Sequence, residues 1–336
     1  MADRRLFLKS MAALTAGLTV PVSLSADNKK PEKDRLGSIL PKRKLGRTNE
    51  YVTMLGTGGF HIGWTTERDA QEVIEAALEG GVRFFDTAES YDAGRSEERY
   101  GKYLTPQYRD LVFLTSKSTG KDAKTVREHL EGTLRRLKTD HLDLYQVHAV
   151  ETPDDVDGRI QEGVLEVMMK AKQEGKARYL GFTGHQNPHA HLRMLEKTNV
   201  DDIFDVVLMP VNVLDHSYFS FIQNVMPVAL KRNMGITSIK SLADGRFFAN
   251  KTQANWTTDD PVVPNYLSIK EAMYFVWSLP VTVLISGNEN ATMMREKIEL
   301  ARNFSELSQE QRTALVEKVK DIALTGTVEY FKKKEA

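Results

Sequence analysis

The chain has 336 residues, with 46 basic and 46 acidic side chains, so its formal charge is zero. This balance argues against a dedicated nucleic-acid-binding protein, and the length suffices for one large domain with a full core. The sequence contains no cysteine, which excludes disulfides, thiolate nucleophiles and cysteine-ligated iron–sulfur clusters.

The first 26 residues have the pattern of a targeting segment. Asp3–Lys9 contains a twin-arginine pair, and an uncharged, moderately apolar stretch follows from Ser10 to Ala26. That stretch is too short and too weakly apolar for a membrane span, which takes about 20 residues. We therefore predict a Tat-type signal peptide over residues 1–26, recognised by the Tat export machinery, with the protein periplasmic or extracellular and without stable membrane insertion. The simpler alternative is a frayed basic N-terminus.

Residues 27–40 are predicted to be a charged linker that is disordered over 27–36. A β-hairpin is predicted from Lys42 to Met54, because Gly46 to Asn49 supply residues that favour turns.

Strand and helix patterns then alternate along the chain. Helical periodicity marks Glu67–Glu79, Asp122–Leu137, Val164–Gln173 and His189–Glu196, and short apolar strands lie at Leu180–Phe182, Val206–Met209, Ile236–Ile239 and Val281–Ile285. Such alternation predicts a parallel sheet with helices outside, and eight units fit within residues 41–324 as a (β/α)8 barrel. An amphipathic helix capped by Ser308 is predicted to close the domain at Leu324, followed by a polar tail, residues 325–336.

Ionisable residues follow three of the predicted strands. Asp86, Lys117 and His148 each come at or directly after a strand end, and Tyr91 lies in the loop five residues after Asp86. The carboxyl ends of parallel strands meet on the face where such barrels build their active sites. The pattern therefore predicts a proton-transfer site.

The residues around these four resemble the tetrad of the aldo-keto reductase family. Asp86 and Tyr91 lie in D-T-A-x-x-Y, Lys117 in L-T-S-K and His148 in Y-Q-V-H. The resemblance includes Lys44–Thr48 and Leu55–Gly59 and continues to about residue 303. It implies a TIM barrel closed at the bottom by the hairpin, which reduces carbonyls with a nicotinamide cofactor and no metal.

Each of the four residues has a role in this interpretation. Free tyrosine titrates near ~10, so Tyr91 as proton donor needs tuning, and the nearby Lys117 cation would lower its pKa. Asp86 would keep Lys117 charged, and His148 would orient the substrate oxygen, as the family assigns. Taken singly, such residues are more often a helix cap, a loop anchor, a solvated charge and a core histidine.

The resemblance also implies a cofactor site and a substrate pocket. Phe60 and Trp64 would line the pocket, and the cofactor contacts would be Gly58, Gly59, Thr183, Asn212, Ser241, Leu242, Gly245, Ser286, Gly287 and Glu296. Three positions around the nicotinamide depart from the family pattern, namely Leu208, Val211 and Ile239. The cofactor is NADP or NAD, with NADP favoured only by family habit.

Two other functions stay open. The altered nicotinamide positions allow a non-catalytic or nucleotide-sensing binding module on the same scaffold, and Lys117 could form a Schiff base in a lyase. The histidines at 185, 189 and 191 are not expected to bind a metal, because the helix that begins after Asn187 points them to different faces. Sugars are a plausible class of exported carbonyl substrate.

Overall fold

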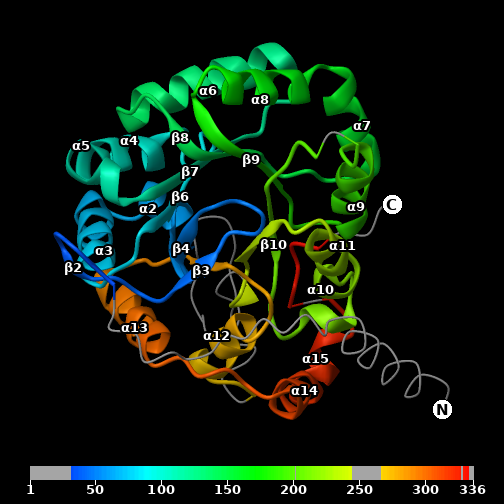
Figure 1. Ribbon diagram of the computed structural model, residues 1–336. Coiled ribbons are helices and arrows are strands. Elements are labelled where there is room, and N and C mark those ends of the chain that lie inside the picture. The colour runs from blue at the N-terminus through cyan, green and yellow to red at the C-terminus, as the bar shows by residue number, and fades with distance from the viewer. Residues whose placement is uncertain (1–31, 201, 244–265, 327, 333–336) are drawn as a thin grey trace. The chain divides into compact units, whose positions relative to one another are not determined.

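In the computed structural model, the described residues are 32–200, 202–243, 266–326 and 328–332. The predicted signal peptide, the beginning of the linker, Gly245 and the end of the tail fall outside them. Eight strands within the described residues form one closed barrel in which every neighbouring pair is parallel (Figure 1). The predicted (β/α)8 barrel is confirmed. In chain order its strands are β5 (Leu55–Gly58), β6 (Phe84–Asp86), β7 (Phe113–Ser118), β8 (Leu142–Val147), β9 (Ala177–Thr183), β10 (Val206–Pro210), β11 (Gly235–Ile239) and β12 (Val283–Ser286).

Helices surround the barrel, as Figure 1 shows. All residues of β6, β7, β8, β10 and β12 are buried, because a parallel sheet is covered on one face by helices and on the other by the barrel interior. The helices are α2 (Gly59–Trp64), α3 (Glu67–Glu79), α4 (Arg95–Tyr103), α5 (Thr105–Tyr108), α6 (Ala123–Leu137), α7 (Pro153–Gln161), α8 (Val164–Gln173), α9 (Pro188–Lys197), α10 (Phe221–Asn224), α11 (Met226–Lys231), α12 (Ile269–Trp277), α13 (Ala291–Arg302), α14 (Gln309–Lys318) and α15 (Lys320–Ala323), with short 3-10 turns η1 (Arg109–Leu111) and η2 (Asp215–Ser217).

Polar caps fix where most of the longer helices begin. The side chain at each cap accepts a hydrogen bond from a backbone N–H of the first turn, which leaves fewer of the orphan N–H groups unpaired. The capping residues are Thr66, Asp122, Thr152, Asn187, Ser268, Asn290 and Ser308.

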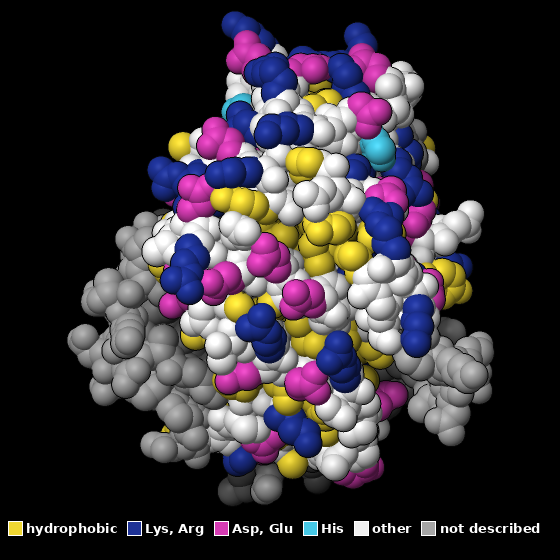
Figure 2. Space-filling view, turned by 90° about the vertical axis from the view of Figure 1, so that its left-hand side faces the viewer, with side chains coloured by type: hydrophobic (Ala, Val, Ile, Leu, Met, Phe, Trp, Pro, Cys, Tyr) yellow, Lys and Arg dark blue, Asp and Glu magenta, His cyan; other side chains and the backbone are white. Residues whose placement is uncertain are grey.

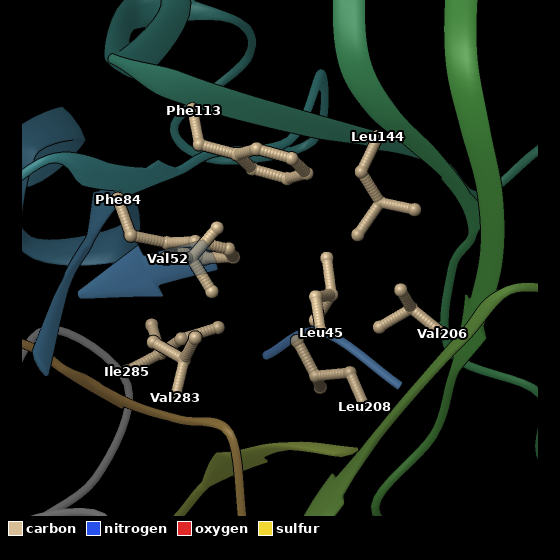
Figure 3. Close-up of a cluster of buried hydrophobic side chains, with 9 residues drawn as sticks. All are labelled: Leu45, Val52, Phe84, Phe113, Leu144, Val206, Leu208, Val283 and Ile285. Carbon is tan, nitrogen blue, oxygen red and sulfur yellow. The ribbon is translucent and has the colours of Figure 1, made fainter. Parts of the chain in front are cut away.

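The predicted hairpin closes the amino-terminal end of the barrel. β3 (Lys42–Lys44) pairs with β4 (Tyr51–Thr53), and Leu45 at the start of the turn is completely buried. In Figure 3, Leu45 and Val52 point into the same space as side chains from the barrel strands. That cluster comprises Leu45, Val52, Phe84, Phe113, Leu144, Val206, Leu208, Val283 and Ile285.

The predicted linker is wrong over residues 32–40. β1 (Lys33–Asp34) and β2 (Gly37–Ser38) form a small antiparallel sheet, and Leu40 is buried. The Arg83 guanidinium donates to the Asp34 carboxylate at 2.7 Å, and both side chains are largely buried. A buried arginine needs a paired acid, and residues 32–40 supply it.

The chain beyond α13 also differs from the prediction. Ser308 caps α14 through a capping box, as expected, but the single helix predicted to reach Leu324 is divided into α14 and α15. The prediction of a polar tail is wrong over residues 328–332, because Glu329 is 1% exposed and Phe331 is 5% exposed.

The described surface carries both signs of charge. Figure 2 shows Lys and Arg side chains interspersed with Asp and Glu on the face it presents. No helix in the described ranges is long and apolar enough to cross a membrane.

Leu45→Ala tests whether the hairpin closes the barrel. Because the leucine is completely buried, its loss should lower the free energy of unfolding by about 2–5 kcal/mol in urea titrations. Val200→Ala, at a position 91% exposed, is the control and should change it little. Equal effects for the two variants would contradict the packing role.

Candidate active site

The structure brings the four predicted residues together at the carboxyl-terminal face of the barrel. Asp86 ends β6, Lys117 is the penultimate residue of β7, and His148 directly follows β8. These three strands are adjacent, and Tyr91 reaches the same point from the loop after β6.

Lys117 is at the centre of the group. Its ammonium donates to Asp86 Oδ2 at 2.7 Å, to the Thr87 carbonyl at 2.6 Å and to Tyr91 Oη at 3.2 Å. These bonds use all three donors of an ammonium. Asp86 is fixed in turn, since its Oδ1 accepts from the Thr115 hydroxyl at 2.8 Å. The lysine is 1% exposed, so its direction toward the phenol is set by these contacts.

Burial decides where the proton rests between Tyr91 and Lys117. Burial raises the pKa of Tyr91 more than the Lys117 charge lowers it, and Asp86 raises it further. Burial alone would lower the pKa of Lys117, but Asp86 and Tyr91 outweigh it and the pKa is raised. The free site therefore holds a neutral phenol beside a charged lysine. The expected lowering by Lys117 is present, but the net direction is the opposite of the one predicted.

His148 also packs against Tyr91. Its ring meets that of Tyr91 edge-on at 5.6 Å between centroids. Burial lowers the pKa of His148 well below its ordinary value, and Lys117, His185 and Arg159 lower it further. The imidazole is therefore neutral at physiological pH, and it can donate a hydrogen bond without adding a charge.

The predicted pocket residues lie next to this group. Phe60, 36% exposed, meets Tyr91 edge-on at 5.6 Å and Trp64 at 6.3 Å. The Trp64 indole N–H is buried without a hydrogen-bond partner in the described part of the chain. Buried donors without a partner are uncommon, and this one belongs to a ring that packs on Phe60.

Comparison with known proteins identifies the family. A sequence model described as "Aldo/keto reductase family" matches residues 54–319. The chain belongs to the aldo/keto reductase family. It is 25% identical over 307 residues to the Bacillus subtilis (strain 168) "Uncharacterized oxidoreductase YqkF", covering 82% of this chain and 95% of that protein. It is also 25% identical over 325 residues to the Arabidopsis thaliana "L-galactose dehydrogenase", covering 83% and 95%.

Solved structures agree on the fold. The "aldo-keto reductase AKR11C1 from Bacillus halodurans (holo form)" superposes with a TM-score of 0.69 at 23% identity, covering 83% of this chain and 96% of that one. At this identity the match supports the fold alone.

The residues that an aldo/keto reductase would use for the anionic end of a dinucleotide fit that use. The Ser241 hydroxyl, after β11, is buried and has no partner among the described residues. After β12, the Lys297 ammonium donates to the Gly287 carbonyl and to Asn288 Oδ1, each at 2.8 Å. Burial lowers the pKa of Lys297 to about 8, so it still carries positive charge at neutral pH. An unpaired hydroxyl and a lysine bonded only to neutral oxygens favour an anion.

Three other predicted cofactor contacts differ in exposure: Ser286 is buried, Leu242 is half-buried, and Glu296 is exposed on α13.

Gly58, which ends β5, and Gly59, which follows it, are explained by protein contacts. A Cβ on Gly59 would lie 2.4 Å from the Asp86 carbonyl, and one on Gly58 would lie 3.2 Å from Ser286. Similarly, a Cβ on Gly287 would lie 2.1 Å from His61 Nδ1. Because these three glycines have no side chains, the loops can pack together with or without a ligand nearby.

The nicotinamide end fits less well. The Thr183 hydroxyl accepts from the Ala149 N–H at 3.1 Å and is buried. Asn212 is completely buried, with Nδ2 donating to Glu329 Oε1 at 2.8 Å and Oδ1 accepting from the Leu214 N–H at 2.8 Å. Asn212 thus has a partner near the C-terminus, and its contact with the cofactor stays a prediction.

Among the described residues, no group of three or more His, Cys, Asp or Glu side chains could hold a metal ion. His191 is completely buried and its Nε2 lies 3.2 Å from the Leu208 carbonyl.

Arg159 is a site residue that the sequence reasoning missed. This buried arginine of α7 donates to the carbonyls of His148 at 3.1 Å and Ala149 at 3.3 Å. Asp155, one turn earlier, accepts from its Nε at 3.1 Å. The i,i+4 spacing in the sequence was visible, but nothing in it indicated that the pair holds the loop carrying His148.

Asp86→Asn tests the central ion pair. It leaves a fully buried ammonium without its carboxylate, so the free energy of unfolding should fall by about 3–5 kcal/mol. The double variant Asp86→Leu, Lys117→Met removes both charges and should be less destabilised. Asp140→Asn, at a side chain 93% exposed, is the control. A loss no greater than that of the control would show that the pair is not buried as described.

Proposed function

We propose that this aldo/keto reductase uses NADP or NAD to reduce aldehydes or ketones to alcohols, with Tyr91 as the proton donor. The observation that carries the proposal is the contact between the Tyr91 phenol and the Lys117 ammonium, which Asp86 holds in place. A neutral phenol has a proton to give, and the charged lysine beside it favours the phenolate that remains. NADP is the family's more common choice of the two nucleotides.

The side chains divide the reaction between them. The nicotinamide, when bound, supplies a hydride to the carbonyl carbon. Tyr91 Oη gives its proton to the carbonyl oxygen, and the adjacent Lys117 charge stabilises the phenolate that remains. The neutral His148 ring donates a hydrogen bond that orients the oxygen, while Phe60 and Trp64 provide the apolar wall.

The substrate class we propose is small carbonyl compounds, including sugars. Phe60 places an aromatic ring beside Tyr91, which suits a partly apolar carbonyl compound. One relative over most of both chains is named for L-galactose, which supports sugars for this chain.

We further propose that residues 1–26 direct export by the Tat pathway, which carries folded proteins. A reductase exported in this way would take its nucleotide along and recycle it between paired substrates.

The double variant Arg4→Lys, Arg5→Lys tests export. The twin-arginine pair is the feature read by the Tat machinery, so immunoblots of cell fractions should show this variant retained in the cytoplasm. Lys29→Arg, Lys30→Arg, an equal number of conservative exchanges outside the signal, should be exported like the parent chain. Export of both variants, or of neither including the parent, would contradict the proposal.

A nucleotide-binding module without catalysis is the second candidate. One observation favours it: Glu329 engages Asn212, which was expected to contact the cofactor on the nicotinamide side. Losing that contact would impair hydride transfer without removing the anionic end of the nucleotide site. A Schiff-base lyase is disfavoured because the pKa of Lys117 is raised, which keeps the amine protonated and non-nucleophilic.

Tyr91→Phe separates the reductase from the binding module. Losing the phenol hydroxyl should lower kcat/KM for a small aldehyde by roughly 10²–10⁴ while leaving nucleotide affinity, measured by fluorescence titration, unchanged. Tyr51→Phe, at a residue 61% exposed, is the matched control. Full activity in Tyr91→Phe would place the proton donor elsewhere, and binding without activity in the parent chain would favour the module.

A further inference from the structure

Residues 328–332 fold back onto the face of the barrel that holds the tetrad. After α15, the segment 328–332 runs beside the loop that follows β10 and beside α10; it is drawn in red inside the ring of helices in Figure 1. Val328 and Phe331 are 4% and 5% exposed. We call residues 328–332 the C-terminal segment.

A buried ion cluster holds the C-terminal segment. The Lys332 ammonium donates to Asp215 Oδ1 at 2.6 Å, to Glu329 Oε2 at 2.8 Å and to the Tyr218 carbonyl at 2.9 Å. The three charged side chains are at most 1% exposed. A docked lysine with all three donors satisfied fixes the register of the segment.

Glu329 connects this cluster to the barrel strand. Its Oε1 accepts from Asn212 Nδ2 at 2.8 Å, and Asn212 stands two residues beyond the end of β10. One of the two N–H donors of the Asn212 side-chain amide is therefore engaged by the chain itself.

Phe331 extends the coverage to the neighbouring strands. Its ring centroid lies 6.3 Å from that of His185, which follows β9, and 5.5 Å from the Lys240 ammonium, which follows β11. His185 is close enough to His148 to affect its pKa. The C-terminal segment thus covers the ends of three consecutive strands, β9, β10 and β11, next to the tetrad.

The ion cluster sets the position in which the C-terminal segment docks, but it does not hold the segment there strongly. With all three groups ionised, Asp215, Glu329 and Lys332 sum to one negative charge, and removing them from water is costly. Burial, opposed by Lys332 and aided by Asp215, raises the pKa of Glu329 to about 7. Because the desolvation cost offsets much of the attraction, the net free energy of docking is far smaller than the number of bonds suggests.

We propose that the C-terminal segment is a displaceable plug, which competes with the nicotinamide ring for Asn212 and for the ends of β9, β10 and β11. The inference rests on the proposed function, since it takes the barrel mouth to be a nicotinamide site. The anionic end of the nucleotide is assigned to Lys297, after β12, and to Ser241, the residue after the Lys240 that Phe331 contacts.

The test compares two probes that differ in the nicotinamide ring. NADPH and 2′-phospho-ADP-ribose are titrated into the parent chain, a chain ending at Gly326, Lys332→Met and the control Lys318→Met. Lys318 is a half-exposed lysine whose partner Glu271 lies on the surface. Circular dichroism checks that each variant folds. If the truncated chain does not fold, Lys332→Met is the variant that releases the C-terminal segment.

We expect release of the plug to tighten NADPH binding by about tenfold or more, the factor by which a minor open population weakens apparent affinity. Affinity for 2′-phospho-ADP-ribose and the behaviour of Lys318→Met should be unchanged. In the parent chain, NADPH should also speed removal of the C-terminal residues by carboxypeptidase, while 2′-phospho-ADP-ribose should not.

The two proposals fail in different ways. Equal NADPH affinity in the parent, the truncated chain and Lys332→Met would overturn the plug and leave the reductase standing. Weaker NADPH binding after release would make the segment a wall of the site instead of a plug. If no form of the chain binds either probe, or NADH and ADP-ribose in their place, the nucleotide-dependent function fails and the plug with it.

Discussion

The buried pair of Lys117 and Asp86 is the constraint on which the site depends. A lysine that is 1% exposed must find acceptors for its three N–H bonds, and it finds them on β6, on the backbone after β6 and on Tyr91. The hydrogen bonds of the lysine thereby join β6 to β7 and set the distance between the ammonium and the phenol. The same pairing keeps the lysine charged, so it fixes both the geometry of the site and the resting place of its proton.

The two ends of the barrel have different tasks. At the amino-terminal end, Leu45 and Val52 fill the interior with apolar side chains, which is a matter of packing. At the carboxyl-terminal end, polar groups are brought together in surroundings that exclude water, where charges and hydrogen bonds act strongly on one another. This division lets the barrel carry buried charges at one end while a dry core stabilises the other.

A second buried lysine governs the other side of the mouth. Lys332 satisfies its donors as Lys117 does, but its partners come from the chain's end and from the turn after β10. Residues that follow the barrel therefore hold the groups after β10 in place.

The sequence by itself determined the barrel, the hairpin and the four residues of the tetrad, because each depends on local patterns: apolar runs, helical periodicity, turn residues and an ionisable residue at a strand end. Tertiary structure decided which polar groups remain available. Asp34 pairs with Arg83 from within the expected linker, and Glu329 takes the Asn212 amide from 117 residues away. Pairings of this kind have no periodicity along the chain, because a buried charge or amide accepts whichever partner the fold brings within reach. For that reason the positions of the tetrad could be predicted from the sequence, and the net direction of the Tyr91 pKa and the engagement of Asn212 could not.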